Sequence, residues 1–522
     1  MSGIRVRTRE DLRSQRRRRP PRCLGHLTVA PLWPMHNANL GTLLRTCDAV
    51  GACMAVPRLP WVPEALAKGN TLRTRACVHW VRPLDWLARR QERVLKNVLA
   101  AEAEGVPVRE LVDRNAAAFE GLRGPLDLSF DAFIRTSSHP GHRAGVERIW
   151  EATRHDLYQR HYEGLYCVGC EQFYPAGPCP DGHEAPLQPV SEQNWFFRLS
   201  RYQDALLDLI RGGRLRIEPA VRRNEVLAFV EAGLDDISVS RSAARARGWG
   251  IPVPGDPGQV VYVWWDALAN YVTALQGGDY ERWWVAEPRK VHLMGKGVIR
   301  FHAVYWPAML LSAGRPLPTG IFVHDYLTAD GRKISKSSGG AADPVALVDA
   351  YGVAAVRWWL LREVPRVGDA DFTEERLVAR ADEDLANGLG NLVNRVVTMV
   401  HRFLDGRVPV EAREEEPFEA HEAVHEALEA FDFRRAATAV QALVEQANRY
   451  VERTRPWARP PAGQEVALAT LVHACRTLAV QLEPFLPTAA ARVAAAVRAN
   501  AEGRLPRPEP LFRRLAGSRQ PV

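Results

Sequence analysis

Two lysines in a glycine-bracketed segment are the residues whose spacing most directly indicates chemistry. The segment reads DGRKISKSSGG over residues 330–340, contains Lys333 and Lys336, and follows the apolar stretch GIFVHDYL. A strand over that stretch would present a flexible, doubly cationic loop, which can close over a triphosphate and neutralise charge as pyrophosphate leaves. A solvated basic loop is the alternative, but K-x-S-K-S after a strand is a far more specific signal than a lone G-x-G-x-x-G.

A cysteine cluster indicates a metal site. The stretch YCVGCEQFYPAGPCPDGH contains a C-x2-C pair and a C-x3-H pair, formed by Cys167, Cys170, Cys179 and His183. Two thiolates on one tight turn, joined by a Cys and a His from a second turn, can complete a structural zinc site. Ordinary loop cysteines are the alternative, and the C-x3-H spacing is longer than the commoner knuckle spacing. The remaining cysteines are scattered, which favours a reducing, cytoplasmic compartment.

Composition limits the classes of protein that the chain can be. A chain of 522 residues is too long for a single hydrophobic core, so we expect several domains. No apolar run is long enough for a membrane span, so we expect no membrane partner. The net charge of +8 favours a polyanionic binding partner, which we expect to be RNA and not DNA. The arginine run at residues 16–19 is either a solvated tail or an RNA-contacting arm.

The elements that must position these residues fall into four segments. We expect a disordered basic arm over 1–23, a small α/β piece over 24–92, a larger α/β domain over 93–373 with a metal knuckle at about 160–190, and a helical domain over 374–522. In the small piece, HLTVAPLW and ACMAV read as strands on either side of a helix. In the helical domain, one apolar stripe precedes the helix-ending Pro456 and comprises Val440, Leu443, Val444, Ala447 and Val451.

K-I-S-K-S resembles the KMSKS signature of class I aminoacyl-tRNA synthetases. Flanking segments narrow the resemblance to the methionyl-tRNA synthetase family: SEQNWFFRLSRYQDALL, GWGIPVPGDPGQVVYVWWDALANYV, FHAVYWPAMLLSAG, DPVALVDAYGVAAVRWWLL and LANGLGNLVNR. The resemblance runs from about residue 95 to 495 in family order. It implies a Rossmann-like parallel sheet with a zinc-knuckle insertion and an all-α anticodon-binding-type bundle. The implied reaction activates methionine with ATP and Mg²⁺ and transfers it to tRNA.

The resemblance also implies roles for particular residues. The family's amino-acid pocket maps onto Trp264, Ala267, Leu268, Tyr271 and His302. Thioethers pack well against aromatic faces, although VYVWWDALANYV alone reads as a buried segment. Gly295 maps to the point where the backbone approaches the adenosine ribose. Lys333 and Lys336 match the mobile phosphate loop, and Lys336 is the stronger candidate for catalysis.

The zinc knuckle and the anticodon-type bundle complete the implied sites. The family's knuckle maps onto the three cysteines and the histidine named above. The anticodon candidates are Asn391, Arg395 and Trp457, because a guanidinium or an indole can stack on unstacked RNA bases. Packing at a helix end is the alternative for Trp457.

Two departures from the family pattern bear on activity. Gly297 stands where the family usually carries an aspartate that holds the ribose, and losing such an acceptor should weaken ATP binding by about 1–3 kcal/mol. We also expect the chain to lack the family's opening half, with its H-x-G-H helix start and its T-G-x-D-E-H-G stretch. The first strand and helix of such a fold build much of the phosphate site.

Residues 24–90 instead resemble the first part of SPOUT-class RNA 2′-O-methyltransferases. In HNANLGTLLRTCDAVGACMAV, Asn39 and Arg45 match that family's asparagine and arginine. A decayed H-x-G-H at NLGT is the alternative, and Arg45 alone would read as a surface residue. The later motifs that build the S-adenosylmethionine pocket are absent, so we expect no methyl transfer.

Three functions remain open on the sequence. The first is a methionine–tRNA ligase, with activity that the missing half could impair. The second is a paralogue that activates an amino acid without tRNA. The third is a non-catalytic RNA-binding protein from a recombined gene, whose binding would weaken steeply with salt.

Overall fold

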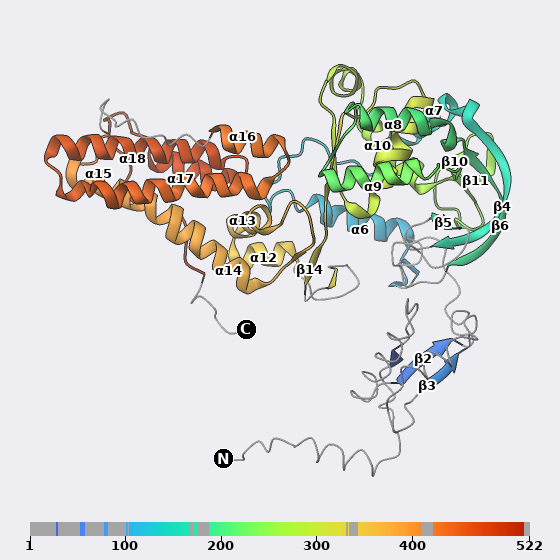
Figure 1. Cartoon of the computed structure of the whole chain (residues 1–522), viewed down its shortest axis with the longest axis horizontal. Helices are drawn as coiled ribbons and strands as arrows, with labels where there is room; N and C mark the ends of the chain where they lie inside the picture. The colour runs from blue at the N-terminus through green and yellow to red at the C-terminus, as the bar shows by residue number, and fades with distance from the viewer. Residues whose placement is uncertain are drawn as a thin grey trace, which may run out of the picture. The chain divides into compact units, whose positions relative to one another are not determined.

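The computed structural model describes most of the chain after residue 100 (Figure 1). The described residues are 101–102, 104–167, 172–174, 187–329, 332–333, 343–408 and 421–515, together with the backbone of three earlier strands. Six predicted site residues lie outside them: Asn39, Arg45, Cys170, Cys179, His183 and Lys336. Cys167 and Lys333 are described by their backbone alone. The contacts within the chain divide it into two compact units. The first comprises Met1–Val94 and His183–Pro186, and the second, larger unit comprises Leu95–Gly182 and Leu187–Val522.

The first unit contains a parallel sheet. Its strands β1 (Thr28–Val29), β2 (Cys53–Pro57) and β3 (Val78–Val81) pair in the order β1-β2-β3. β1 lies within HLTVAPLW and β2 almost coincides with ACMAV, so both predicted strands are confirmed. Parallel strands need a crossover connection, which fits the length of chain between β1 and β2.

A second parallel sheet organises the α/β part of the larger unit. It comprises β7 (Arg216–Glu218), β12 (Val291–Gly295) and β13 (Gly320–His324), in the order β12-β13-β7. Ile321 and Val323 are buried on one face of the central strand and Phe322 on the other, as expected for a parallel strand covered on both faces. The helices of this part are α6 (Val108–Glu120), α7 (His142–Ala152), α8 (Gln203–Arg211), α9 (Ala220–Glu231), α10 (Val263–Thr273) and α11 (Trp306–Ser312).

Aromatic side chains fill the core of this part. Trp150, Phe197 and Trp265 are nearly inaccessible, and Trp265 meets the other two edge-on, with ring centroids 5.6 and 5.5 Å apart. Such edge-to-face pairs stabilise beyond the area that they bury. Short helical turns lie at η1 (Arg154–Asp156), η2 (Leu199–Tyr202), η3 (Tyr280–Ala286), η4 (Lys296–Val298) and η5 (Phe301–Tyr305).

Three antiparallel or mixed sheets complete the strands of the larger unit. The largest pairs the long strands β4 (Leu157–Cys167) and β6 (Gln188–Phe197), which curve together in Figure 1, with β5 (Gln172–Tyr174) and β8 (Ile237–Ser238). A second contains β9 (Ser240–Ser242), β10 (Pro252–Val253) and β11 (Asp256–Val261). A third contains β14 (Leu327–Ala329), β15 (Arg332–Lys333) and β16 (Ala370–Asp371).

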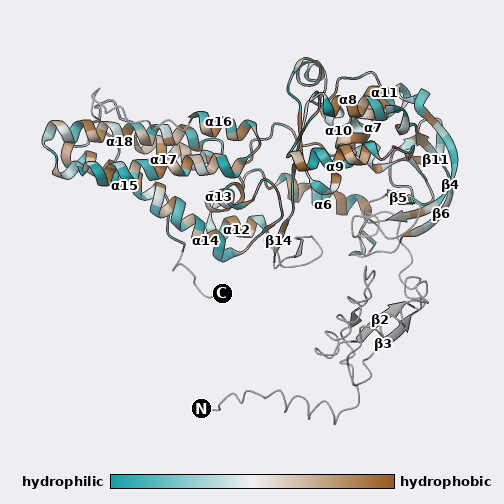
Figure 2. Ribbon diagram, viewed as in Figure 1, coloured by the Kyte–Doolittle hydropathy of each residue, from teal (hydrophilic) through white to brown (hydrophobic). Residues whose placement is uncertain are grey.

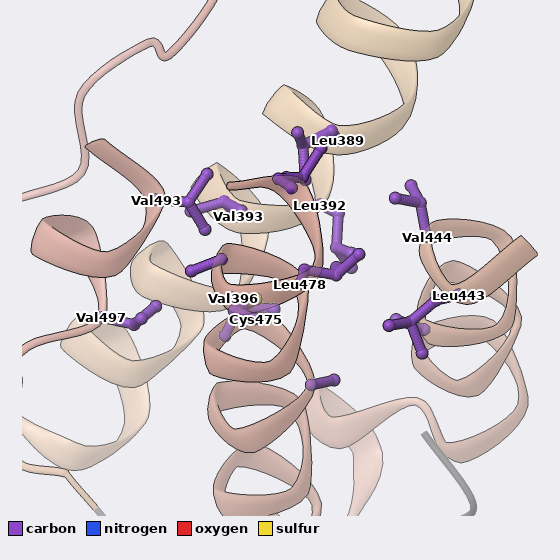
Figure 3. Packing of buried hydrophobic residues seen from close by; sticks show 14 of the residues in the cluster. Leu389, Leu392, Val393, Val396, Leu443, Val444, Cys475, Leu478, Val493 and Val497 are labelled. Carbon is purple, nitrogen blue, oxygen red and sulfur yellow. The ribbon is translucent and has the colours of Figure 1, made fainter. Parts of the chain in front are cut away.

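Helices dominate the chain after residue 343. They are α12 (Pro344–Tyr351), α13 (Val353–Glu363), α14 (Glu374–Arg380), η6 (Ala381–Gly390), α15 (Asn391–Leu404), α16 (His421–Glu429), α17 (Phe433–Thr454), η7 (Pro456–Ala458), α18 (Pro461–Leu482) and α19 (Pro487–Ala496). Figure 2 shows apolar faces alternating with polar ones along these helices. Figure 3 shows Val396, Cys475 and Val493 approaching one another from three of them. All five residues of the predicted stripe are buried on α17, which ends before Pro456, so this prediction is confirmed.

Within the part of the chain that the structure describes, no single helix is long and apolar enough to cross a membrane. One sharply bent pair, Pro344–Tyr351 with Val353–Glu363, meets that test by length and composition only.

Candidate active site

The candidate site lies where the parallel strands β12 and β13 end. Gly295 and His324 are the last residues of these strands and pair with each other across the ladder. In open α/β sheets, ligands bind beyond the carboxyl ends of the strands. The turn of Gly295, Lys296 and Gly297 is therefore brought beside Asp325 and Tyr326 at the edge where a ligand is expected.

Three of the five predicted pocket residues meet in one aromatic cluster. Trp264 and Tyr271 lie seven residues apart on α10 and so share a face of the helix. Trp264 stacks on Phe301 with centroids 3.8 Å apart, and Tyr271 Oη lies 3.0 Å from His302 Nε2. Leu268 points into the hydrophobic core and is 1% exposed.

Ala267 does not enter the aromatic cluster through any recorded ring contact. It is half-buried on α10.

Hydrogen bonds fix the protonation of the cluster. His302 Nδ1 lies 3.0 Å from the Val298 carbonyl, which can only accept, so Nδ1 carries the proton and Nε2 accepts from the Tyr271 hydroxyl. Burial lowers the pKa of His302 and raises the pKa of Tyr271 to about 12. A neutral imidazole and a neutral phenol result, and such a surface suits an uncharged ligand side chain.

His292 is a member of this cluster that the sequence analysis missed. It is 4% exposed on β12, and its ring centroid lies 3.9 Å from that of Tyr271 and 6.1 Å from that of Trp284. Its Nε2 has no hydrogen-bond partner among the described atoms. Burial, with a smaller effect of His302, lowers the pKa of His292 to about 3. A histidine inside the apolar stretch VHLMG was the available signal.

An ionic network ties the ends of β12 and β13 to the start of β16. Lys296 Nζ donates to Asp369 Oδ1 at 2.6 Å and lies 3.5 Å from Asp325 Oδ1. Asp325 is also paired with Arg222, and its Oδ2 accepts from the Gly368 backbone at 2.7 Å. The hydrogen bond to Asp369 raises the pKa of Lys296, and the same bond lowers the pKa of Asp369. The buried Asp325 therefore has the partners that its charge requires.

The network also anchors the hairpin that leads to the lysine-rich loop. Asp369 Oδ1 accepts from the Tyr326 backbone at 2.9 Å, directly before β14. β14 pairs with β16 on one side and with β15 on the other, where Thr328 stands opposite Lys333. The backbone of Lys333 thus belongs to a sheet fixed at the end of β13. Lys336 lies beyond the described residues.

The expectation that the chain lacks an H-x-G-H helix start needs one correction. Residues 139–142 read H-P-G-H, and α7 begins at His142. His142 is fully buried, with Nδ1 2.6 Å from Thr273 Oγ1 and Nε2 2.5 Å from Asp266 Oδ1. Both ring nitrogens are committed to α10, so this histidine fixes two helices together and offers no surface to a phosphate.

The predicted zinc ligands fall largely outside the described residues. Cys167 ends β4 and stands opposite Gln172 of β5, so the C-x2-C pair spans the connection between two paired strands. Among the residues that are described, no group of three or more His, Cys, Asp or Glu side chains could hold a metal.

The anticodon candidates lie on the helical part. Asn391 is exposed at the start of α15, and Arg395 follows one turn later with its Nη2 2.7 Å from Glu452 Oε1 of α17. Trp457 lies in η7, just after α17, and is 45% exposed. The pair between Arg395 and Glu452 brings the start of α15 towards the end of α17, and hence towards Trp457.

Two family models match the chain. The model "tRNA synthetases class I (M)" matches residues 94–188 and 182–397, and "Anticodon binding domain of methionyl tRNA ligase" matches 412–513.

Three individual relatives are methionine–tRNA ligases, which agrees with both family models. The methionine–tRNA ligase of Brucella melitensis is 38% identical over 462 residues, covering 81% of this chain and 88% of the relative. That of Halalkalibacterium halodurans is 39% identical over 432 residues, and that of Caldanaerobacter subterraneus 39% over 412. These alignments cover 75% and 74% of this chain but only 64% and 63% of the two relatives.

A solved structure of Mycobacterium tuberculosis methionyl-tRNA synthetase bound by methionyl-adenylate is also similar. It superposes with a TM-score of 0.74 at 31% identity, over 93% of this chain and 100% of that one. The class I fold and its helical anticodon-binding domain agree with the architecture described above. The chain therefore belongs to the class I methionyl-tRNA synthetase family.

Proposed function

We propose that the chain is a methionine–tRNA ligase, which activates methionine with ATP and transfers it to tRNA. The observation that carries the proposal is the neutral aromatic cluster of Trp264, Tyr271 and His302, in which His302 bonds the Val298 carbonyl three residues after β12, in a chain of this family. An apolar thioether packs favourably against such rings, and a nucleotide at the strand ends would lie next to it.

In this proposal each group of residues has a separate task. The aromatic cluster binds the methionine side chain, and the hydrogen bond from Tyr271 keeps the His302 ring oriented. Lys333 and Lys336 neutralise the phosphates as the methionine carboxylate attacks the α-phosphate and pyrophosphate leaves. Gly295 lets the backbone approach the ribose. Mg²⁺ would accompany ATP as its phosphate-bound counterion.

Methionine-dependent exchange of pyrophosphate into ATP tests the first half-reaction. The full chain should exchange with methionine and ATP, and omission of methionine should abolish the exchange. No exchange above the protein-free background, in a protein shown to be folded, would exclude ligase activity. Exchange with a different amino acid that is indifferent to tRNA would favour the tRNA-independent paralogue, and salt-sensitive tRNA binding without exchange would favour a non-catalytic RNA-binding protein.

Asn391, Arg395 and Trp457 are the proposed contacts to the anticodon. The exposure of Trp457 and the position of Arg395 beside the end of α17 support this assignment. Stacking of an indole on an unpaired base does not require a particular base, whereas amide and guanidinium groups can read base edges.

A structural zinc ion is also proposed, held by Cys167, Cys170 and Cys179, with His183 as the fourth ligand by sequence. The pairing of Cys167 with Gln172 supports a thiolate pair at a strand connection, which is a favourable geometry for one tetrahedral ion. Bound zinc stabilises the local fold and supplies no step of the reaction. Elemental analysis of the purified chain should give about one zinc per chain, and C170S should lower that ratio.

We further infer that residues 24–90 are related to SPOUT-class methyltransferases. The parallel order β1-β2-β3 is consistent with an α/β piece of that kind. Asn39 and Arg45, which carry the resemblance, lie outside the described residues.

The cytoplasmic location inferred from the scattered cysteines stays a prediction.

A further inference from the structure

We propose that the cavity between α7, α10 and η3 binds a backbone phosphate of tRNA through Arg148 and Arg315. This inference rests on the proposed function, because that function makes tRNA a substrate. Neither arginine was among the site residues expected from the sequence. Neither belongs to the aromatic cluster or to the ionic network at the strand ends.

The cavity has a volume of about 330 Å³ and brings polar side chains together from three elements. Gly145 and Arg148 of α7 line it, together with Gln276, Tyr280 and Arg315. A Cβ atom on Gly145 would lie 3.7 Å from Arg148 Nη2, so the guanidinium of Arg148 lies back along its own helix. The described residues that line the cavity include two arginines and neither an aspartate nor a glutamate.

The positive charges of this cavity are not neutralised by carboxylates. Within the described part of the larger unit, neither Arg148 nor Arg315 forms an ion pair, and the only hydrogen bond of Arg315 is to Tyr280. Arg143 on the same helix, by contrast, pairs with Glu147 at 2.9 Å. Two guanidinium groups that share a cavity repel each other, and an anion bound between them replaces this repulsion with attraction.

Tyr280 orients Arg315 and adds a further donor. Arg315 Nη1 donates to Tyr280 Oη at 3.1 Å, and the guanidinium carbon lies 5.7 Å from the centroid of the Tyr280 ring. A hydroxyl group that accepts this bond keeps its own proton available for a ligand. Arg315 is also half-buried just after α11, so its side chain loses less conformational entropy when an anion binds.

A phosphate group of RNA matches these donors. The planar guanidinium fork binds two phosphate oxygens at once, and charge-assisted bonds of this kind are the strong ones. Arg148 is exposed, so a phosphate on the outside of a large polyanion can reach it. The net charge of +8 attracts such a polyanion to the chain. Phosphate contacts position a nucleic acid without reading its sequence, so this subsite would orient tRNA and leave its recognition to the anticodon residues.

Filter binding of tRNA to the full chain at several salt concentrations tests the subsite. We expect R148A and R315A each to weaken tRNA about threefold to tenfold, and the double variant to reduce the slope of log affinity against log salt by about one. R214A is the matched control, because Arg214 is an exposed arginine between α8 and β7 that does not line the cavity. A loss in R214A equal to that in R148A and R315A would reduce the effect to net charge and overturn the subsite.

A second pair of variants tests the charge of the cavity without removing an arginine. Gln276 lines the cavity, and its Nε2 lies 3.1 Å from His139 Nε2. Q276E adds a carboxylate that competes with the phosphate for the two arginines, whereas Q276A removes the same amide and adds no charge. Q276E should therefore weaken tRNA more than Q276A does, and equal effects of the two variants would overturn the subsite. Circular dichroism and thermal melting establish that each variant is folded.

The outcomes separate this inference from the proposed function. Methionine-dependent exchange takes place without tRNA, so R148A and R315A should leave it unchanged. Normal exchange with unchanged tRNA affinity in both variants overturns the phosphate subsite and leaves the ligase standing. Weaker tRNA binding in both variants, in a chain that shows no exchange, supports the subsite and excludes the ligase. If calorimetric titration shows that both variants bind inorganic pyrophosphate more weakly while tRNA affinity is unchanged, the cavity holds a free anion and the assignment to tRNA is overturned.

Discussion

Neutral histidines in the aromatic cluster of the candidate site are the main feature at the scale of single residues. His292 and His302 have ring centroids 6.1 Å apart, and burial lowers the pKa of both. Two imidazolium ions so close together would repel each other in a region with little water. Both histidines of the cluster are therefore uncharged near neutral pH, and they become protonated only under acidic conditions.

Replacement of His292 should alter the pH dependence of stability. The pKa of His292 is about 3 in the folded chain and 6.5 as a free side chain. Above pH 6.5 the residue is neutral in both states, and as the pH falls towards 3 only the unfolded state takes up the proton, so the folded state loses stability. At about pH 5 this loss amounts to about 2 kcal/mol.

H292F should remove that contribution, because phenylalanine does not titrate. Urea denaturation at about pH 7.5 and about pH 5 measures it: the wild type should lose about 2 kcal/mol more than H292F between the two conditions. Equal losses in the two proteins would show that the ring is not buried as described.

Lys336 should be needed for the exchange reaction. Removing a charge that stabilises the departing phosphates costs about a hundredfold to a thousandfold in rate, so we expect K336A to lower methionine-dependent exchange by about that factor. K290A is the control, because Lys290 precedes β12 at the opposite end of the sheet and its Nζ donates to the Glu287 carbonyl. A similar loss in K290A would indicate a general effect on folding.

At the scale of elements, periodicity could be read from the sequence and tertiary proximity could not. The α17 stripe and the strands β1 and β2 were predicted because each follows from local spacing of apolar residues. The overlap between Tyr326 and a Cβ at Gly297 could not be predicted, because it joins two strand ends that are distant in sequence. His292 was overlooked for the same reason: its partners come from α10 and η3.

The close packing of α7 on α10 gives a prediction at this scale. A Cβ on Gly145 would overlap the Thr273 methyl group, so G145A forces the helix that carries Trp264 and Tyr271 to shift. Overpacking costs about 1–3 kcal/mol, partly offset by about 1 kcal/mol of improved helix propensity. We expect net destabilisation in urea denaturation and a raised KM for methionine.

The double variant G145A/T273S should recover most of both losses. Serine lacks the methyl group and keeps the hydroxyl that bonds His142 Nδ1 at 2.6 Å. G124A is the control, since no atom lies within 4 Å of an added Cβ there. Persistent destabilisation in the double variant would mean that the contact between Gly145 and Thr273 is not the cause.

At the scale of the whole molecule, the same chain joins an α/β part with a helical part that both match one synthetase family. Arg289 of the α/β part bonds Glu429 of α16 at 2.8 Å, and Phe322 of β13 stacks on Phe431 with centroids 5.0 Å apart. These contacts join the α/β part to the helical part. The proposed amino-acid and anticodon sites are therefore parts of one unit, as transfer to tRNA requires.

Binding of tRNA should depend on Trp457 far more than on a tryptophan of equal exposure elsewhere. Trp457 is 45% exposed in η7, just after the helix whose Glu452 bonds Arg395, whereas Trp283 is 46% exposed in η3, where Arg282 covers its ring. Stacking of one base contributes about 1–3 kcal/mol, so W457A should weaken tRNA about fivefold to a hundredfold in filter binding, and W283A should have little effect.

The salt dependence separates base stacking from backbone contacts in the same experiment. Stacking on an indole releases no counterions, so W457A should lower the affinity at every salt concentration and leave the slope of log affinity against log salt unchanged. R395A should reduce that slope by about one if Arg395 leaves Glu452 to contact a phosphate, and should leave it unchanged if Arg395 reads a base. Equal effects of W457A and W283A would remove the anticodon assignment and leave only non-specific attraction between a basic chain and RNA.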